Sequence, residues 1–290
     1  MCFTPLVSIG TATAEFLIAA HLKRKIKDPK LKLAPVFIFL LGLYQFTEFM
    51  LCKTNNPEIW SRIGFVSYTF LPIVFMHFTL NISQKRMEKA LYILPVGISL
   101  LALLHPNFLI YSSCNLLHVS VMNVIFDQYY SLTVIYSVLY FVFPAYGLFC
   151  FVKTFKNKFM DKTSSKMVAV LIPLTVIVSQ ATIILLAIKN INPTLLWIVI
   201  SIFLFILSLA LILLGIIPFW KKSYYFRFVA LFAFASSGLT VPILYVILPL
   251  MSYDFPSIFC QFAFFYSIAI LVFVNAFERQ KGEGREVAKN

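Results

Sequence analysis

Two acidic side chains lie inside long apolar stretches of the sequence. Glu15 is in TATAEFLIAAH and Glu48 is in LYQFTEFMLC, and neither stretch contains Lys or Arg. A carboxyl group within a bilayer costs ~2.5–3.5 kcal/mol on insertion scales, so it usually faces the interior of a helix bundle, carries a proton or has a partner. Such groups move protons, bind cations or act as general acids and bases. Glu15 and Glu48 are therefore candidate ligand- or proton-binding residues.

Polar and small neighbours support an interior position for both acids. Helical spacing puts Tyr44, Gln45 and Glu48 on one face, where either neighbour could hydrogen-bond to the acid. Around Glu15, small residues recur at the spacing of one narrow helix stripe, which is typical of helix–helix contacts in bilayers; they are Ser8, Thr11, Ala12 and Ala19. The two acids would then line one outward-open cavity at different depths. A purely structural role, with both acids protonated, fits the same pattern.

Two further polar side chains complete the set of candidates. His77, in LPIVFMHFTL, is expected near the depth of Glu15, and a Glu15–His77 pair could carry a proton or bind an amine. Gln180, in VSQATI, lies in a later apolar stretch. Each could equally be a structural hydrogen-bonding residue.

Apolar stretches long enough to cross a bilayer position these side chains. Hydrophobic residues make up 61% of the 290-residue chain and charged residues 12%, about half the charge of a usual soluble domain. About 20 helical residues cross ~30 Å of hydrocarbon. The sequence predicts an all-α, polytopic transmembrane bundle of about nine helices, or seven if one pair is re-entrant. The stretches are 5–22, 34–52, 64–83, 90–106, 130–152, 167–188, 195–219, 228–250 and 258–277. Residues 1–277 form one membrane domain and 278–290 a short charged cytoplasmic tail.

Basic residues alternate between the connections of these stretches. Segments 22–33, 84–89, 153–166, 220–227 and 278–290 hold six, three, five, three and four Lys or Arg, against Lys53, Arg62 and Lys189 in the opposite connections. The positive-inside rule then predicts an outer N-terminus and a cytoplasmic C-terminus. The net charge of +13 reflects a basic inner rim that attracts anionic lipid, so no nucleic-acid partner is expected.

Four of the five cysteines fall on the predicted outer side. They are Cys2, Cys52, Cys114 and Cys260, whereas Cys150 lies toward the cytoplasm. An oxidising compartment would allow these four to form disulfides, and the spacing does not choose among three pairings. Alternatively, they are small buried hydrophobic residues.

Sequence signatures of soluble enzymes and metal sites are absent. The chain has no GxGxxG, GxxxxGK[ST], GxSxG, HExxH or CxxC motif, and its four His residues are not at ligand spacing. We therefore expect neither a metal nor a cofactor.

The N-terminal fifty residues resemble a family of uncharacterised prokaryotic multi-pass membrane proteins. That family begins Met-Cys-Phe-Ser and has a Pro, Gly and Gln-x-x-Glu pattern in its second helix. The matching positions are Cys2, Phe3, Ser8, Pro35, Gly42, Gln45 and Glu48, and Thr4 replaces the usual Ser. The resemblance implies a prokaryotic plasma-membrane protein with a site around Cys2, Gln45 and Glu48, and it names no reaction.

These observations predict a receptor-like or carrier-like protein whose outward-facing polar pocket binds or passes a small molecule or ion. The main alternative is an intramembrane enzyme that uses Glu48 as general acid or base beside Cys2. A structural membrane subunit is the third alternative.

Overall fold

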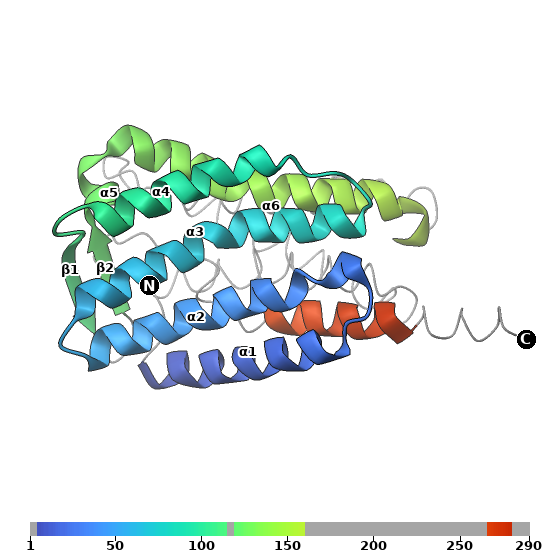
Figure 1. Cartoon of the computed structure of the whole chain (residues 1–290), viewed down its shortest axis with the longest axis horizontal. Helices are drawn as coiled ribbons and strands as arrows, with labels where there is room; N and C mark the ends of the chain where they lie inside the picture. Colours follow the sequence, from blue (N-terminus) through green and yellow to red (C-terminus); the bar gives the residue numbers. More distant parts are fainter. Residues whose placement is uncertain (1–4, 115–118, 160–265, 280–290) are drawn as a thin grey trace, which may run out of the picture.

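The long helices run in alternating directions along one long axis (Figure 1). The structure is a computed structural model that describes residues 5–114, 119–159 and 266–279. Its helices are α1 (Pro5–Lys25), α2 (Ala34–Lys53), α3 (Pro57–Ile82), α4 (Ile93–Leu104), α5 (Val124–Gln128) and α6 (Tyr130–Phe159), with 3-10 turns η1 (Pro29–Leu31) and η2 (Lys89–Tyr92). Residues 266–279 are also helical and lie beside the α1–α2 hairpin.

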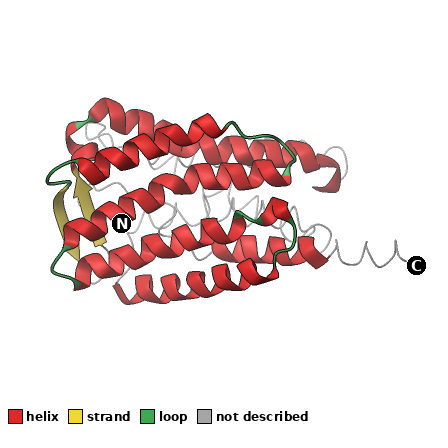
Figure 2. Ribbon diagram, in the orientation of Figure 1, coloured by secondary structure: helices red, strands yellow, loops and turns green. Residues whose placement is uncertain are grey.

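The predicted predominance of helix is confirmed (Figure 2). Two helical stretches of the described residues, Pro29–Lys53 and Pro57–Ile82, are long and apolar enough to cross a membrane. The described residues do not extend to nine helices, and the stretches predicted at 167–188, 195–219 and 228–250 lie outside them.

A small β-sheet at one end of the bundle corrects the prediction of an entirely helical chain. Strands β1 (Leu109–Cys114) and β2 (Val119–Asn123) pair antiparallel, with Ser112 opposite Val121. Each strand contains two β-branched or aromatic residues, which favour strands: Ile110 and Tyr111 in β1, and Val119 and Val121 in β2. Both segments are too short to cross a membrane, so a search for spans assigns them to a loop.

The basic connections gather at the opposite end from this sheet. The α1–α2 and α3–α4 connections and the C-terminal end of 266–279 share one end of the bundle, while Lys53 and Arg62 lie at the β1–β2 end (Figure 1). The alternating charge of the sequence thus becomes a difference between two ends of one molecule.

Small residues bring neighbouring helices close together. A Cβ atom placed on Gly42 of α2 would lie 3.0 Å from the ring of Phe16 on α1. A Cβ atom on Gly147 of α6 would lie 3.0 Å from the backbone Cα of Met76 on α3, and it would also overlap the hydroxyl group of Thr79. The absence of a side chain at these two positions therefore allows the observed close spacing of the helices.

A charged pair closes the end of α4. The guanidinium group of Arg62 on α3 donates to the carbonyl oxygens of Ala102 (2.9 Å) and Leu103 (2.6 Å), which are among the acceptors that a helix end leaves unsatisfied. Arg62 is also paired with Glu58, whose carboxylate accepts the backbone N–H of Phe108 at 3.0 Å. Arg62 and Glu58 therefore attach the last turn of α4 and the start of the following loop to α3.

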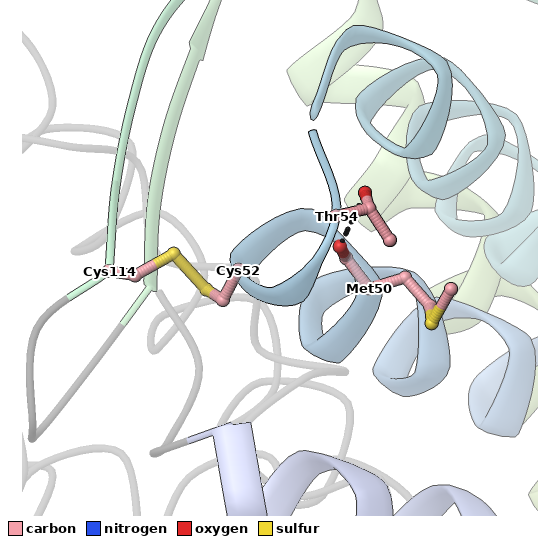
Figure 3. Close-up of a disulfide and its surroundings, with 4 residues drawn as sticks. All are labelled: Met50, Cys52, Thr54 and Cys114. Atoms are coloured by element: carbon pink, nitrogen blue, oxygen red, sulfur yellow. Dashed lines mark hydrogen bonds between the residues drawn. A yellow bond between two sulfur atoms is a disulfide. The ribbon is translucent and has the colours of Figure 1, made fainter. Parts of the chain in front are cut away.

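A disulfide joins the sheet to the bundle (Figure 3). Cys52, in the last turn of α2, is bonded to Cys114 at the end of β1, with the two Cα atoms 5.8 Å apart. Thr54 donates from its hydroxyl group to the carbonyl oxygen of Met50 at 2.9 Å, which closes the end of α2 beside the bridge. Cys150 is free and buried in α6. Cys2 and Cys260 lie outside the described residues.

Gly147→Ala should destabilise the protein by about 1–3 kcal/mol, because the added methyl group forces the backbones of α3 and α6 apart. Gly97→Ala is the matched control, since Gly97 of α4 has no atom within 4 Å of an added Cβ. The Gly97→Ala variant should be as stable as the wild type or more stable by up to ~1 kcal/mol, because alanine has the higher helix propensity. Thermal unfolding of both variants in detergent measures the difference, and equal melting temperatures would contradict the close contact.

Removal of the bridge with Cys52→Ser and Cys114→Ser should destabilise the protein by about 4 kcal/mol in the loop-entropy account, because the bridge closes a loop with a sequence separation of 62. Alkylation followed by peptide mass spectrometry should find Cys52 and Cys114 protected until a reductant is added. The control, Cys150→Ser, should keep the bridge. Labelling of Cys52 without reduction would contradict the pairing.

Candidate functional site

Glu15 occupies the middle of α1, completely buried from solvent. It is ten residues from each end of the helix, or about 15 Å at 1.5 Å per residue. The hydroxyl group of Ser267 donates to Glu15 Oε1 at 3.3 Å. Glu15 Oε2 is also buried and has no hydrogen-bond partner among the described residues. We call Glu15 and Ser267 the Glu15 site.

Local sequence explains why this acid is enclosed. Gly42 on α2 lets the two helices approach, because a Cβ atom at that position would lie only 3.2 Å from Glu15 Cβ. Ser8 and Ala12, on the predicted stripe of small residues, are completely buried as well. The stripe therefore faces the interior of the bundle, as its spacing indicated.

A second contact fixes the register of Ser267 against Glu15. Glu278 Oε1 accepts the backbone N–H groups of Lys27 (3.1 Å) and Asp28 (3.0 Å) just beyond α1. Ser267 precedes Glu278 by eleven residues and Glu15 precedes Lys27 by twelve, so the two contacts have nearly equal spacing along two helices that run in the same direction. The Glu278 contact at the basic end thus supports the Ser267 contact about 16 Å away.

The electrostatics of the Glu15 site favour a bound proton or cation. A carboxylate loses its hydrating water molecules on burial, and the single hydroxyl group of Ser267 makes up for little of this lost hydration. A buried charge without compensation raises the free energy of the folded protein by several kcal/mol. The described residues place no Lys, Arg or His against this carboxyl group, which would otherwise neutralise it. A proton or a small cation at Oε2 would balance the charge.

Glu48 belongs to a separate polar cluster nearer the disulfide. Glu48, Gln45 and Tyr44 are all buried in α2, with Glu48 only 5% exposed. The side chain of Tyr44 forms a hydrogen-bonding interaction with Glu48, one of the two partners that helical spacing offered. Glu48 follows Gly42 by six residues, which puts it about 9 Å closer than the Glu15 site to the β1–β2 end. The two acids thus lie at different levels of the bundle.

The structure does not bring Glu15 and His77 together. His77 Nδ1 lies 3.0 Å from the hydroxyl group of Tyr92 in η2, and its ring packs edge-on against the Tyr92 ring. His77 is five residues from the basic end of α3, about 8 Å, rather than at the depth of Glu15. His77 lies on the face of α3 that contacts the connection to α4. Glu15, in contrast, faces α2 and Ser267.

The remaining candidates have less structural support. Gln180 and Cys2 lie outside the described residues, so the alternative that pairs Glu48 with Cys2 has no geometry to support it. Among the described residues, no three His, Cys, Asp or Glu side chains are close enough to hold a metal ion.

One crevice in the described part of the chain lies away from both acids, between α3, α4 and α6. It has room for about one water molecule. The hydroxyl groups of Thr69 and Tyr136 meet there at 3.4 Å. Sequence reasoning missed this pair because neither residue stands out in its apolar stretch. The crevice does not adjoin Glu48, so it is not the outward-facing pocket that was predicted.

A comparison of the chain with protein-family models, curated proteins and solved structures finds no match.

Glu48→Gln should leave the fold intact, because the amide keeps the size of the side chain and can still accept a hydrogen bond from Tyr44. Glu48→Leu should destabilise the protein by about 1–3 kcal/mol, because the polar groups around it lose their partner. Thermal unfolding in detergent compares the two variants with the wild type. Equal stability of the Leu variant would mean that Glu48 has no partner that matters for folding.

Proposed function

We propose that this chain is a multi-pass plasma-membrane protein, with its N-terminus outside and its basic connections in the cytoplasm. The observations that support this proposal are two membrane-length apolar helices and the gathering of basic connections at one end of the bundle. An end that holds a disulfide agrees with an outer, oxidising side. The resemblance of the first fifty residues to prokaryotic multi-pass proteins remains part of this proposal.

Within that protein, the Glu15 site binds or passes a proton or a small cation, in a carrier-like manner. The observation that carries this proposal is the buried Oε2 atom of Glu15, which has no partner among the described residues. Glu15 is halfway along α1, and coupling ions of membrane carriers bind near the midplane of the bilayer. Ionisable groups at this depth commonly mark ion pathways.

Ser267 serves as the second group of the site. Its hydroxyl group donates to Oε1 when Glu15 is charged, and its oxygen lone pairs can join the carboxyl group in binding a cation. Because Ser267 stands on a different helix from Glu15, a change of ligand at the site would alter the contact between α1 and 266–279. Such a contact gives the site a route to conformational change.

The test uses purified protein in liposomes that contain a pH-sensitive dye, with a potassium diffusion potential as the driving force. If the ion is a proton, wild-type protein should acidify the lumen faster than empty liposomes do. If the ion is sodium, its entry leaves the dye unchanged, so uptake of radiolabelled sodium under the same potential should exceed that of empty liposomes. Glu15→Gln should reduce this rate to that of empty liposomes, because the amide cannot release a proton or balance a cation. Ser267→Ala should change the apparent affinity for the ion.

The matched control is Glu88→Gln, which removes an exposed acid from the α3–α4 connection. It should transport at the wild-type rate. Two outcomes would overturn the assignment and leave Glu15 a structural residue. One is a wild-type rate of ion flux in the Glu15→Gln variant. The other is a folded wild-type protein that gives no flux above empty liposomes with either ion.

A further inference from the structure

The crevice between α4 and α6 is apolar and open at the surface. It is lined by Pro72 of α3, by Leu94, Pro95 and Ile98 of α4, and by Tyr136 and Phe143 of α6. With its open mouth it contains about 260 Å³ of space free of protein atoms. Thr69 and Tyr136 are the polar residues of its lining, and their hydroxyl groups lie 3.4 Å from each other. Its shape and lining suit part of a hydrocarbon chain.

Exposed apolar side chains continue from this crevice along both helices. On α4, Ile93 is 72% exposed and Leu100 is 50% exposed; on α6, Val142 and Phe149 are similarly exposed. In a bilayer these side chains contact lipid. Helix α4 has twelve residues, or about 18 Å, and is shorter than the ~30 Å of hydrocarbon. A short helix thins the bilayer or draws headgroups toward its ends.

Three basic residues precede α4 in the chain, and the last of them, Lys89, is five residues before Leu94 of the crevice. They are Lys85, Arg86 and Lys89, in the connection that leads from α3 to α4. Gln84 adopts a positive φ of 57°, and the N–H of Lys85 bonds back to the carbonyl oxygen of Leu80 at 2.9 Å, so the chain reverses sharply after α3.

The turn brings the connection against α6. Lys85 Nζ lies 3.4 Å from Cys150 Sγ of α6, while Arg86 and Lys89 are exposed. The connection has one acid, Glu88, which is also exposed. The connection from α3 to α4 therefore carries positive charge beside α6, at the end of α4 that is nearer to Leu94 of the crevice.

We propose that this crevice binds one anionic phospholipid of the inner leaflet. Its phosphate group lies against Lys85, Arg86 and Lys89, and one acyl chain runs along the crevice between α4 and α6. Charge complementarity selects an anionic headgroup, and the exposed apolar rims of α4 and α6 hold the chain. The inference rests on the membrane orientation proposed above and does not depend on ion binding at Glu15.

Native mass spectrometry of the purified full chain, titrated with phosphatidylglycerol or phosphatidylcholine, tests the site. The wild-type protein should retain one phosphatidylglycerol molecule more tightly than any phosphatidylcholine molecule. A variant with Lys85→Gln, Arg86→Gln and Lys89→Gln should bind phosphatidylglycerol about 10- to 100-fold more weakly. Leu94→Trp, which fills the crevice without changing charge, should also weaken retention.

The matched control carries Lys23→Gln, Lys25→Gln and Lys27→Gln, which removes the same charge from the α1–α2 connection at the same end. It should retain the bound lipid. If both triple variants lost phosphatidylglycerol equally, the lipid would be attracted to any basic surface of the protein, and the proposed site would be overturned. Equal retention of phosphatidylcholine, or unchanged retention in a folded Leu94→Trp variant, would also overturn it. Failure of the ion-flux test would leave these outcomes unaffected.

Discussion

Close approach of helix backbones at small residues is the contact on which the rest of this bundle depends. Lipid tails are as apolar as the surfaces of such helices. Moving an apolar side chain from lipid to a helix contact therefore contributes little to the stability of a helix bundle in a bilayer. Gly42 instead lets α2 approach the side chains of Glu15 and Phe16 on α1, and Gly147 lets α6 approach the backbone of α3 at Met76. Each close contact also positions a polar group, since Glu15 stands beside Gly42 and Thr79 beside Gly147.

The two ends of the bundle are closed by different chemistry. At the sheet end, the Cys52–Cys114 bridge and the Arg62 contacts hold β1 and the last turn of α4. At the basic end, Glu278 and Asp28 satisfy backbone N–H groups of the α1–α2 turn, with Asp28 Oδ1 accepting from the N–H of Lys30 at 2.9 Å. The two acids therefore stabilise a turn that would otherwise carry only repelling cations.

Between these closed ends, the polar groups of the interior differ in how completely they are satisfied. Serine and threonine hydroxyl groups mostly donate to carbonyl oxygens of their own helix, as Thr69 does to Phe65 at 2.7 Å. Glu48 and Tyr44 support each other within α2. Glu15 differs from them because its hydrogen-bond partner among the described residues comes from the far end of the chain, and none of these residues donates to its second oxygen atom.

The sequence by itself determined the helical character of the chain, the approximate bounds of its first two helices and the inward face of the Glu15 stripe. These features follow from local periodicity and from the positions of charge, which neighbouring residues alone specify. The common face of Tyr44, Gln45 and Glu48 has the same origin. The β1–β2 hairpin was not predicted because its strands are short, and the length of apolar stretches does not distinguish short strands from a loop.

Tertiary structure decided which distant side chains meet. Periodicity gives the depth of a residue along a helix but not the rotation of one helix against another, so it could not show that His77 faces Tyr92. It also could not show that Ser267, more than two hundred residues away in the chain, lies against Glu15. The pairing of Cys52 with Cys114 depended on where the hairpin folds back, which no spacing of cysteines specifies.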